Sequence, residues 1–491
     1  MTSAPPVAET ERALAPVGRP SARAGPAPWL FDATAMVCLL ALMARVSIHA
    51  AQPLDNGDTW FHLRIGHELW GPWSLDHPGG LTRFATSPWV PTQWSTEMVS
   101  AKVEDWFGLP GVAVLFGTLF VVFVVAVYAL CRRYCAPLGA VVATSLAVIG
   151  AAPSLSARPQ VVSLVLATVV VGSWLRAGRD LRAPWLLVPL TWVWATAHGL
   201  WSIGVVIGAV ACVGIALDRR PDRRTTLRLA AVPALSLVAA CLTPLGPRLL
   251  TSQAAVGARS SLISEWQATS FREVPAFVVG LMMALVVLRW ARSREVDWLP
   301  LLLLLLGAAW TAMVQRLVGF GGVLAAPLLA TVFQQLLDRS SRWRRPGRPE
   351  RLVVLGGALA CVLGLVLATP HTAAGPGGVP DRFTGRLAAL PDGATVAVED
   401  STGAWIEWRF PRLDPTIDGM LDAYPVDYIS AFNDFRELRP GWQGFLERSG
   451  AHDAVLLAHS PLSAAVQEQL HWRVVQRDGA WVYLVAPGSA R

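Results

Sequence analysis

Arginine-rich links follow every second apolar run of this chain, and this alternation constrains its fold more than any other feature. A helix needs about 20 apolar residues to cross a bilayer. The predicted spans are 29–50, 110–131, 136–152, 160–175, 184–197, 200–217, 228–244, 274–290, 298–314, 317–337 and 351–369. Several are short, and the pairs within 136–175 and 184–217 could be divided differently.

The arginines predict the orientation of these eleven spans. With the N-terminus inside, the inner links contain Arg132-Arg133; Arg176, Arg179 and Arg182; Arg219-Arg220, Arg223-Arg224 and Arg228; Arg289, Arg292 and Arg294; and Arg339, Arg342, Arg344, Arg345, Arg348 and Arg351. The outer links carry isolated arginines only, among them Arg158, Arg248, Arg259, Arg272 and Arg316. Because basic residues concentrate in cytoplasmic loops, the sequence predicts an N-in/C-out protein of the inner membrane.

Composition excludes two broad classes. Charged residues make up 15% of the chain and hydrophobic residues 53%, whereas soluble proteins carry about 25% charged residues. The net charge of +7 resides in the links, which indicates topology and argues against nucleic acid as a partner. The six cysteines lie in or beside predicted spans and form no disulfide framework. The fold class is therefore a polytopic α-helical membrane protein.

Two polar pieces fall on the predicted outer side. One is the loop 51–109, and the other is a small extracytoplasmic C-terminal α/β domain at 370–491, tethered by a flexible Gly375–Pro380 segment. Residues 29–369 form the transmembrane domain, and 1–28 form a disordered cytoplasmic tail with no signal peptide. The predicted elements of the C-terminal domain are strand 395–399, helix 402–408, strand 416–418, helix 426–449, strand 454–457, helix 463–470 and the hairpin 472–476/481–485.

The stretch 54–69 begins the first outer loop and carries its chemistry. Asn56-Gly57 is a turn signal, and Asp58 then stands at the expected N-cap of a helix. Asp58 and His62 are four residues apart and share a helix face. The apolar residues of this helix, Trp60, Phe61, Leu63 and Leu69, are expected at the membrane surface. The alternative is that Asp58 only caps an interfacial helix.

Polar residues at other outer span ends complete a candidate site. They are Arg158, Gln160, His198, Glu265 and Arg316. Ionisable groups at membrane depth are costly, so they are functional candidates. Each has a structural alternative: the arginines could extend to the headgroups, His198 could stabilise a turn, and Glu265 could cap a short helix.

Several short motifs resemble the GT-C class of membrane glycosyltransferases. They are Gly57–Leu63, Arg158-Pro159-Gln160, Trp194–Gly199, Ile263–Trp266, Ile417-Asp418-Gly419 and Trp472–Val475. The resemblance implies many spans, a first outer loop with an acidic residue, and a polyprenyl-phosphate-linked sugar donor. Metal-using members often carry a second acidic pair in a later outer loop, but Pro153–Gln160 contains no acid. A divalent metal therefore stays open as a cofactor, with Glu265 as a substitute ligand.

The implied reaction is an inverting transfer of a sugar to an envelope glycan, lipid or protein on the outer side of the bilayer. Such a transfer needs a base for the acceptor hydroxyl and positive groups for the departing phosphate. We expect Asp58 as the base with Asp55 second, His62 beside it, and Arg158, His198 and Arg316 as phosphate contacts. The alternatives are a transporter or flippase, a non-catalytic scaffold of envelope assembly, and a ligase that moves a whole lipid-linked glycan.

Overall fold

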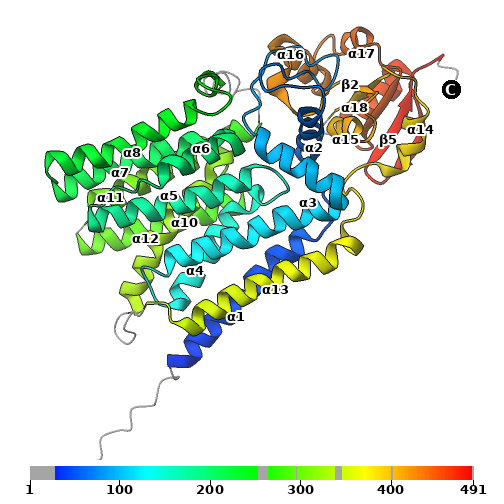
Figure 1. Ribbon diagram of the computed structural model, residues 1–491. Coiled ribbons are helices and arrows are strands. Elements are labelled where there is room, and N and C mark those ends of the chain that lie inside the picture. The colour runs from blue at the N-terminus through cyan, green and yellow to red at the C-terminus, as the bar shows by residue number, and fades with distance from the viewer. Residues whose placement is uncertain (1–27, 253–263, 295, 338–344, 400–401, 489–491) are drawn as a thin grey trace, which may run out of the picture.

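The computed structural model describes residues 28–252, 264–294, 296–337, 345–399 and 402–488 (Figure 1). Every predicted span coincides with a helix in these ranges. These helices are α1 (Pro28–Ala50), α3 (Trp94–Cys131), α4 (Pro137–Ala151), α5 (Gln160–Asp180), α6 (Leu187–Ala197), α7 (Ser202–Arg219), α8 (Arg223–Cys241), α10 (Val274–Ser293), α11 (Trp298–Met313), α12 (Val318–Leu337) and α13 (Arg348–Thr372). The predicted N-terminal tail lies outside the described residues except for its last position.

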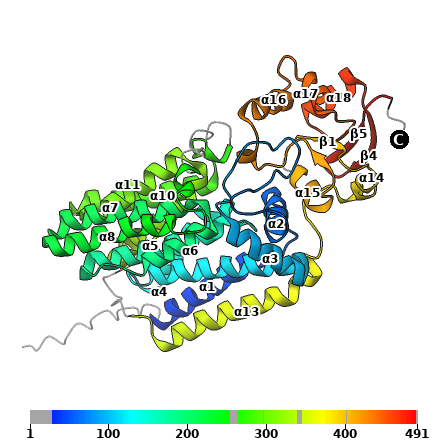
Figure 2. The same cartoon turned by 45° about the horizontal axis from the view of Figure 1, so that its top comes forward.

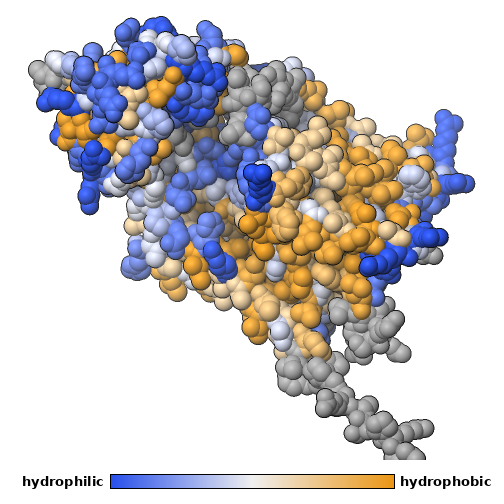
Figure 3. Space-filling model, turned by 180° about the vertical axis from the view of Figure 1, so that it is seen from behind, coloured by the Kyte–Doolittle hydropathy of each residue, from blue (hydrophilic) through white to orange (hydrophobic). Residues whose placement is uncertain are grey.

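Among the described residues, nine helices are long and apolar enough to cross a membrane, and α6 and α11 are shorter apolar helices. On the face seen in Figure 3, a broad hydrophobic band covers the helical part, with hydrophilic residues at either end. Leu352 and Leu367 of α13 are 71% and 74% exposed, as expected for side chains in contact with lipid. The polytopic helical membrane fold is thus confirmed, while the number of true spans and their orientation stay predictions.

Helix ends that the arginine alternation assigns to one side do contact one another. At the predicted inner side, Arg132 at the end of α3 donates from Nε to Glu350 of α13 at 2.8 Å. Asp218 of α7 accepts hydrogen bonds from the first two backbone N–H groups of α11. These contacts agree with the predicted order of spans, although Arg339, Arg342 and Arg344 lie outside the described residues.

Helix α3 consists of two segments that meet at Gly108. Its backbone there has φ 64° and ψ −165°, a conformation that favours glycine. The predicted span begins just beyond this break, and the residues before it form a separate helical segment along the first outer loop. Trp106 and Phe107, immediately before the break, are 68% and 67% exposed. Aromatic rings at this position suit the membrane–water boundary.

The C-terminal part contains a five-stranded sheet of order β2-β1-β3-β5-β4. The strands are β1 (Thr395–Val398), β2 (Asp414–Pro415), β3 (Asp453–Leu457), β4 (Arg473–Asp478) and β5 (Trp481–Val485), and the helices include α15 (Thr402–Arg409), α16 (Val426–Arg436), α17 (Gln443–Ser449) and α18 (Pro461–Leu470). Strands β2, β1 and β3 are parallel, and β5 runs antiparallel to β3 and β4.

Two expected elements of this sheet region were placed wrongly. The second strand lies at Asp414–Pro415, because its pairing with Thr395 and Val396 fixes the register there and leaves residues 416–418 beyond it. The expected helix 426–449 is broken into α16 and α17. Pro440 cannot donate a helical hydrogen bond, and Gly441 adopts φ 88°.

The segment after α13 is held in place, contrary to the expected flexible tether. Gly377 donates its N–H to the carbonyl of Leu54 at 2.8 Å, and Leu54 and Pro376 form a parallel bridge. A Cβ on Gly377 would lie 2.8 Å from Cβ of Pro53, so the two segments approach closely. The sheet region therefore begins beside the first outer loop.

Candidate functional site

Helix α2 (Gly57–Trp70) positions the acidic residue of the first loop. Its N-cap is Asn56, whose side chain accepts a hydrogen bond from the Asp58 N–H at 3.0 Å. The expectation that Asp58 itself is the cap was wrong, because the turn residue Asn56 already supplies the capping oxygen. The carboxylate of Asp58 therefore extends from the first turn of α2 without a capping role.

The apolar side of α2 packs inside the protein and does not lie on the membrane surface as expected. Trp60 is 1% exposed, and its ring centroid lies 4.8 Å from that of Trp408 in α15. On another side Gly66 packs against α3, where an added Cβ would lie 2.2 Å from the Glu97 carbonyl oxygen. Helix α2 is thus enclosed between α3 and the C-terminal sheet region (Figure 2). The apolar face of α2 that we expected to contact lipid packs against the C-terminal sheet region instead.

Polar contacts fix the C-terminal region to the same loop. The backbone N–H of Arg83 donates to Asp414 Oδ1 at 3.0 Å, and its guanidinium donates to the Ser449 carbonyl at 2.6 Å. Ser87 donates its N–H to the Ala423 carbonyl at 2.9 Å. Because these contacts are direct, α2 and the sheet region lie on the same side of any membrane that the helices cross.

Four of the predicted site residues form a continuous arginine–carboxylate chain. Arg158 Nη1 lies 2.7 Å from Asp58 Oδ2 and 2.9 Å from Glu265 Oε1. Arg316 Nη1 lies 2.9 Å from Glu265 Oε2. These residues come from α2, the link before α5, the short helix Ser264–Trp266 and the link before α12, so folding brings distant segments together.

Burial gives this chain its electrostatic character. Arg158 is 4% exposed, and its Nε donates to Ser156 Oγ at 2.9 Å. Burial lowers the pKa of Arg158, but the carboxylates of Asp58 and Glu265 outweigh it and raise that pKa above its usual value. The guanidinium is therefore charged at all accessible pH values. A phosphate could take the place of the Asp58 or Glu265 carboxylate beside this guanidinium.

Gln160 and His198, two further predicted site residues, make hydrogen bonds to neighbouring segments. Gln160 Nε2 donates to Ser154 Oγ at 2.9 Å and to the Arg316 carbonyl at 3.3 Å. His198 Nδ1 accepts from the Leu200 N–H, so the proton of the neutral ring is on Nε2. Burial lowers the pKa of His198 well below its usual value. The Leu200 contact fits the turn-stabilising alternative, while Oγ of Ser163 in α5 lies 2.8 Å from the same Nδ1.

His62 is paired with Glu97, whereas its expected partner Asp58 is paired with Arg158. Nδ1 of His62 lies 2.8 Å from Glu97 Oε1, and both side chains are buried. Burial lowers the pKa of His62 although Glu97 opposes this shift. Glu97 was missed in the sequence because it stands 35 residues further on with no local motif. Its position in the first turn of the loop-side segment of α3 was the only available signal.

Asp55 is separate from the arginine–carboxylate chain. Its side chain is exposed and lines a pocket of about 260 Å³ beside the arginine–carboxylate chain. Within the described residues, no group of three or more His, Cys, Asp or Glu side chains could hold a metal ion. Both carboxylate oxygens of Glu265, the expected substitute ligand, accept hydrogen bonds from guanidinium groups.

The two loop histidines predict opposite pH effects on stability. The folded-state pKa of His62 is lowered, so its contribution is present above pH ~6.5 and is lost as the pH falls. His67 Nε2 donates to Glu104 Oε2 at 3.0 Å, and this hydrogen bond raises the folded-state pKa of His67, so its contribution is present below pH ~6.5 and is lost at higher pH. We expect His62→Gln to reduce the loss of stability in acid and His67→Gln to reduce the loss in base.

Thermal unfolding of the detergent-solubilised protein between about pH 5 and 9 measures both effects. His77→Gln, at an exposed position of the same loop, is the control and should leave the pH profile unchanged. A shift of both profiles in the same direction would contradict the assignment.

Comparison with known proteins finds similarity in structure only. No protein-family model matches the chain, and no curated protein matches it in sequence. The crystal structure of ArnT from Cupriavidus metallidurans in the apo state matches with a TM-score of 0.50 at 17% identity, over 93% of this chain and 97% of that one. ArnT bound to undecaprenyl phosphate gives a TM-score of 0.49 at 16% identity, over 94% and 98% of the two chains. This chain therefore shares its overall fold with apo ArnT.

Proposed function

We propose that this protein is a membrane glycosyltransferase of the GT-C type. It moves a sugar from a polyprenyl-phosphate donor to an envelope glycan, lipid or protein at the outer face of the cytoplasmic membrane. The observation that carries the proposal is the pair of guanidinium groups, Arg158 and Arg316, which Glu265 bridges beside Asp58.

The fold and the charges support a phosphate-bearing lipid as donor. ArnT, whose apo structure shares this fold, has also been crystallised with undecaprenyl phosphate. Guanidinium groups match phosphate oxygens with paired hydrogen bonds, and Arg158 is pre-positioned by Ser156 and by the Pro153 carbonyl. The apolar surface of the neighbouring helices would accommodate the polyprenyl chain.

Asp58 is suited to act as the general base. When a donor phosphate binds Arg158, it competes with the Asp58 carboxylate for the same nitrogen. Asp58, which stays on the rigid first turn of α2, is then free to accept the proton of the acceptor hydroxyl. The hydroxyl oxygen attacks the anomeric carbon, the bond from that carbon to the phosphate oxygen breaks, and polyprenyl phosphate leaves with its charge on the arginines. Attack from the face opposite the phosphate would invert the anomeric centre.

The proposal also assigns the site to one side of the membrane. The positive-inside rule places α2 and the sheet region, which contact each other directly, in the extracytoplasmic compartment. The proposed division of the chain is a transmembrane domain at 29–369 and an extracytoplasmic domain at 370–491. The transporter alternative predicts charged pairs near mid-bilayer. The ion pairs between described residues lie instead at helix ends, in loops or in the sheet region.

Reconstitution tests the proposal without knowledge of the acceptor. Purified protein in liposomes should consume at least one member of a panel of undecaprenyl-phosphate sugars and release undecaprenyl phosphate. It should also bind undecaprenyl phosphate saturably. Envelope glycans from cells with and without the gene should differ in one sugar. If no donor is consumed and no saturable binding occurs, the proposal fails.

A further inference from the structure

The pocket that contains Asp55 is a second site, distinct from the arginine–carboxylate chain. It measures about 260 Å³ and lies where the outer end of α1, the start of α2, the first part of the α3 span and the segment after α4 meet. Ligand pockets for whole drug-sized molecules are typically ~300–1,000 Å³. This volume therefore fits one end of a longer molecule.

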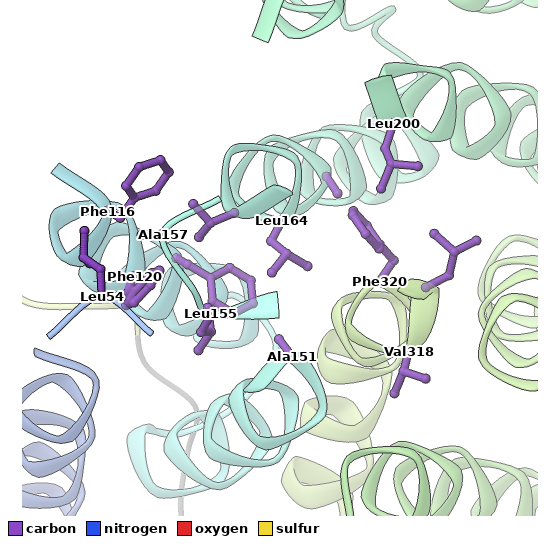
Figure 4. Close-up of a cluster of buried hydrophobic side chains, with 14 of the residues drawn as sticks. Leu54, Phe116, Phe120, Ala151, Leu155, Ala157, Leu164, Leu200, Val318 and Phe320 are labelled. Carbon is purple, nitrogen blue, oxygen red and sulfur yellow. The ribbon is translucent and has the colours of Figure 1, made fainter. Parts of the chain in front are cut away.

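The inner wall of the pocket is apolar. Phe116, Phe120 and Leu155 are 3%, 2% and 4% exposed, and Leu54 lies beside them (Figure 4). Phe120 stands twelve residues beyond the break at Gly108, which corresponds to about 18 Å along the helix. Phe120 nevertheless lies level with the outer end of α1, because its ring stacks on His49, so the wall reaches the boundary between the loop and the spans. Such a wall suits an alkyl or prenyl chain.

The rim of the pocket is polar, and its charge is negative. Asp55 and Gln52 are exposed there, and His49 lies with its ring stacked on Phe120 at 6.2 Å. Of the described residues that line the pocket, none is a lysine or arginine. An anionic headgroup would meet the Asp55 carboxylate, and the guanidinium of Arg158, behind the lining residue Ser156, is already paired with Asp58 and Glu265. The rim instead favours hydroxyl or ammonium groups, which donate hydrogen bonds to a carboxylate.

The pocket and the arginine–carboxylate chain share a wall. Ser156 lines the pocket, and its Oγ accepts from Arg158 Nε at 2.9 Å. Asn56 and Thr59, also in the lining, flank Asp58 in sequence, and Thr59 Oγ1 donates to the Ala157 carbonyl at 3.0 Å. The pocket is therefore lined by Thr59, the residue that follows the proposed base Asp58 in the sequence.

We propose that this pocket holds the acceptor, and that the acceptor is an amphiphile whose hydroxyl-bearing headgroup carries no negative charge. That the bound lipid is the acceptor rests on the proposed function, whereas the lipid site itself rests on the geometry of the pocket. For the transfer, the hydroxyl would extend from the pocket past Ser156 and Thr59, lose its proton to Asp58 and form the new bond to the anomeric carbon, and the donor's polyprenyl phosphate would leave with its charge on Arg158 and Arg316.

Photo-labelling tests the site independently of turnover. A diazirine-bearing monoacylglycerol is the uncharged probe, and an acyl phosphate with the same chain is its anionic counterpart. With full-length protein in liposomes, we expect the uncharged probe to label peptides containing residues 49–56, 113–120 or 152–157. The anionic probe should label these peptides about tenfold less, since it lacks a favourable charged contact there. Excess unlabelled monoacylglycerol should abolish the labelling, and undecaprenyl phosphate should not.

A charge reversal sharpens the test. Asp55→Arg should reduce labelling by the uncharged probe about tenfold and increase labelling by the anionic one. Asp76→Arg, on an exposed position of the same loop outside the pocket, should change neither. Equal labelling by both probes in the parent protein, displacement by undecaprenyl phosphate, or no labelling of these peptides would overturn the inference. Pocket labelling in a protein that consumes no donor would instead retain the lipid site and refute the proposed function.

Discussion

Replacing Asp58 with asparagine should reduce turnover of a polyprenyl-phosphate sugar by about 10³-fold, because a positioned general base typically contributes ~10²–10⁴. The amide keeps the size of the carboxylate, and its oxygen can still accept the hydrogen bond from Arg158. It cannot accept a proton at neutral pH. Binding of undecaprenyl phosphate should be preserved or strengthened, since the competing negative charge at Arg158 is removed.

The measurement is donor consumption in proteoliposomes, with thermal unfolding as a check that the variant is folded. Asp76→Asn is a matched control, because Asp76 is also a loop carboxylate paired with an arginine, Arg248, at 2.9 Å. It is 72% exposed and lies outside the proposed site. Full activity in the Asp58 variant would remove Asp58 from the mechanism, and equal loss in both variants would point to a general effect on the loop.

The helical part of the fold was predictable because two physical signals agree along the chain. Apolar length marks each helix, and arginine-rich links mark the boundaries between them, which is why even the short helices α6 and α11 were placed. Turn chemistry likewise marked the break before α2. The position of the cap within that break was wrong by two residues, because Asn56 and Asp58 are both good capping residues and local sequence does not separate them.

The partners of α2 could not be predicted in the same way. An apolar helix face such as that of Trp60 is equally suited to lipid and to protein. Only the tertiary position of Trp408, 348 residues later in the chain, decides between them. The same reason explains the missed pair of Glu97 with His62. Asp58 was a plausible partner at helical spacing, whereas α3 supplies a closer one through the glycine contact at Gly66.

The candidate site could be predicted in part. Span ends on one side must meet, so the sequence could bring Asp58, Arg158, Glu265 and Arg316 to one region. It could not supply the pairing, because the four residues lie on four separate segments whose packing determines the distances. Asp55 shows the limit: it stands three residues from Asp58, and the start of α2 between them directs it to a different pocket.

Removing Arg158 should separate the structural and the catalytic roles of the arginine–carboxylate chain. In Arg158→Gln, Asp58 loses the guanidinium 2.7 Å away, and Glu265 keeps only Arg316. Breaking a fully buried pair costs roughly 3–5 kcal/mol. Because Asp58 is 30% exposed, we expect a loss of about 2 kcal/mol in unfolding free energy. The affinity for undecaprenyl phosphate should fall about 10²-fold, since a charge-assisted bidentate contact is lost.

The double variant Asp58→Asn/Arg158→Gln decides between the two roles. Two neutral amides can hydrogen-bond to each other, so thermal unfolding should show most of the lost stability restored, with a coupling energy of about 1–2 kcal/mol. Donor turnover should stay as low as in the worse single variant, because neither the base nor the phosphate contact returns. Arg158→Lys, which keeps the charge without the planar fork, should be intermediate in affinity. If turnover recovered together with stability, the ion pair would be a structural link and the reacting groups would have to lie elsewhere.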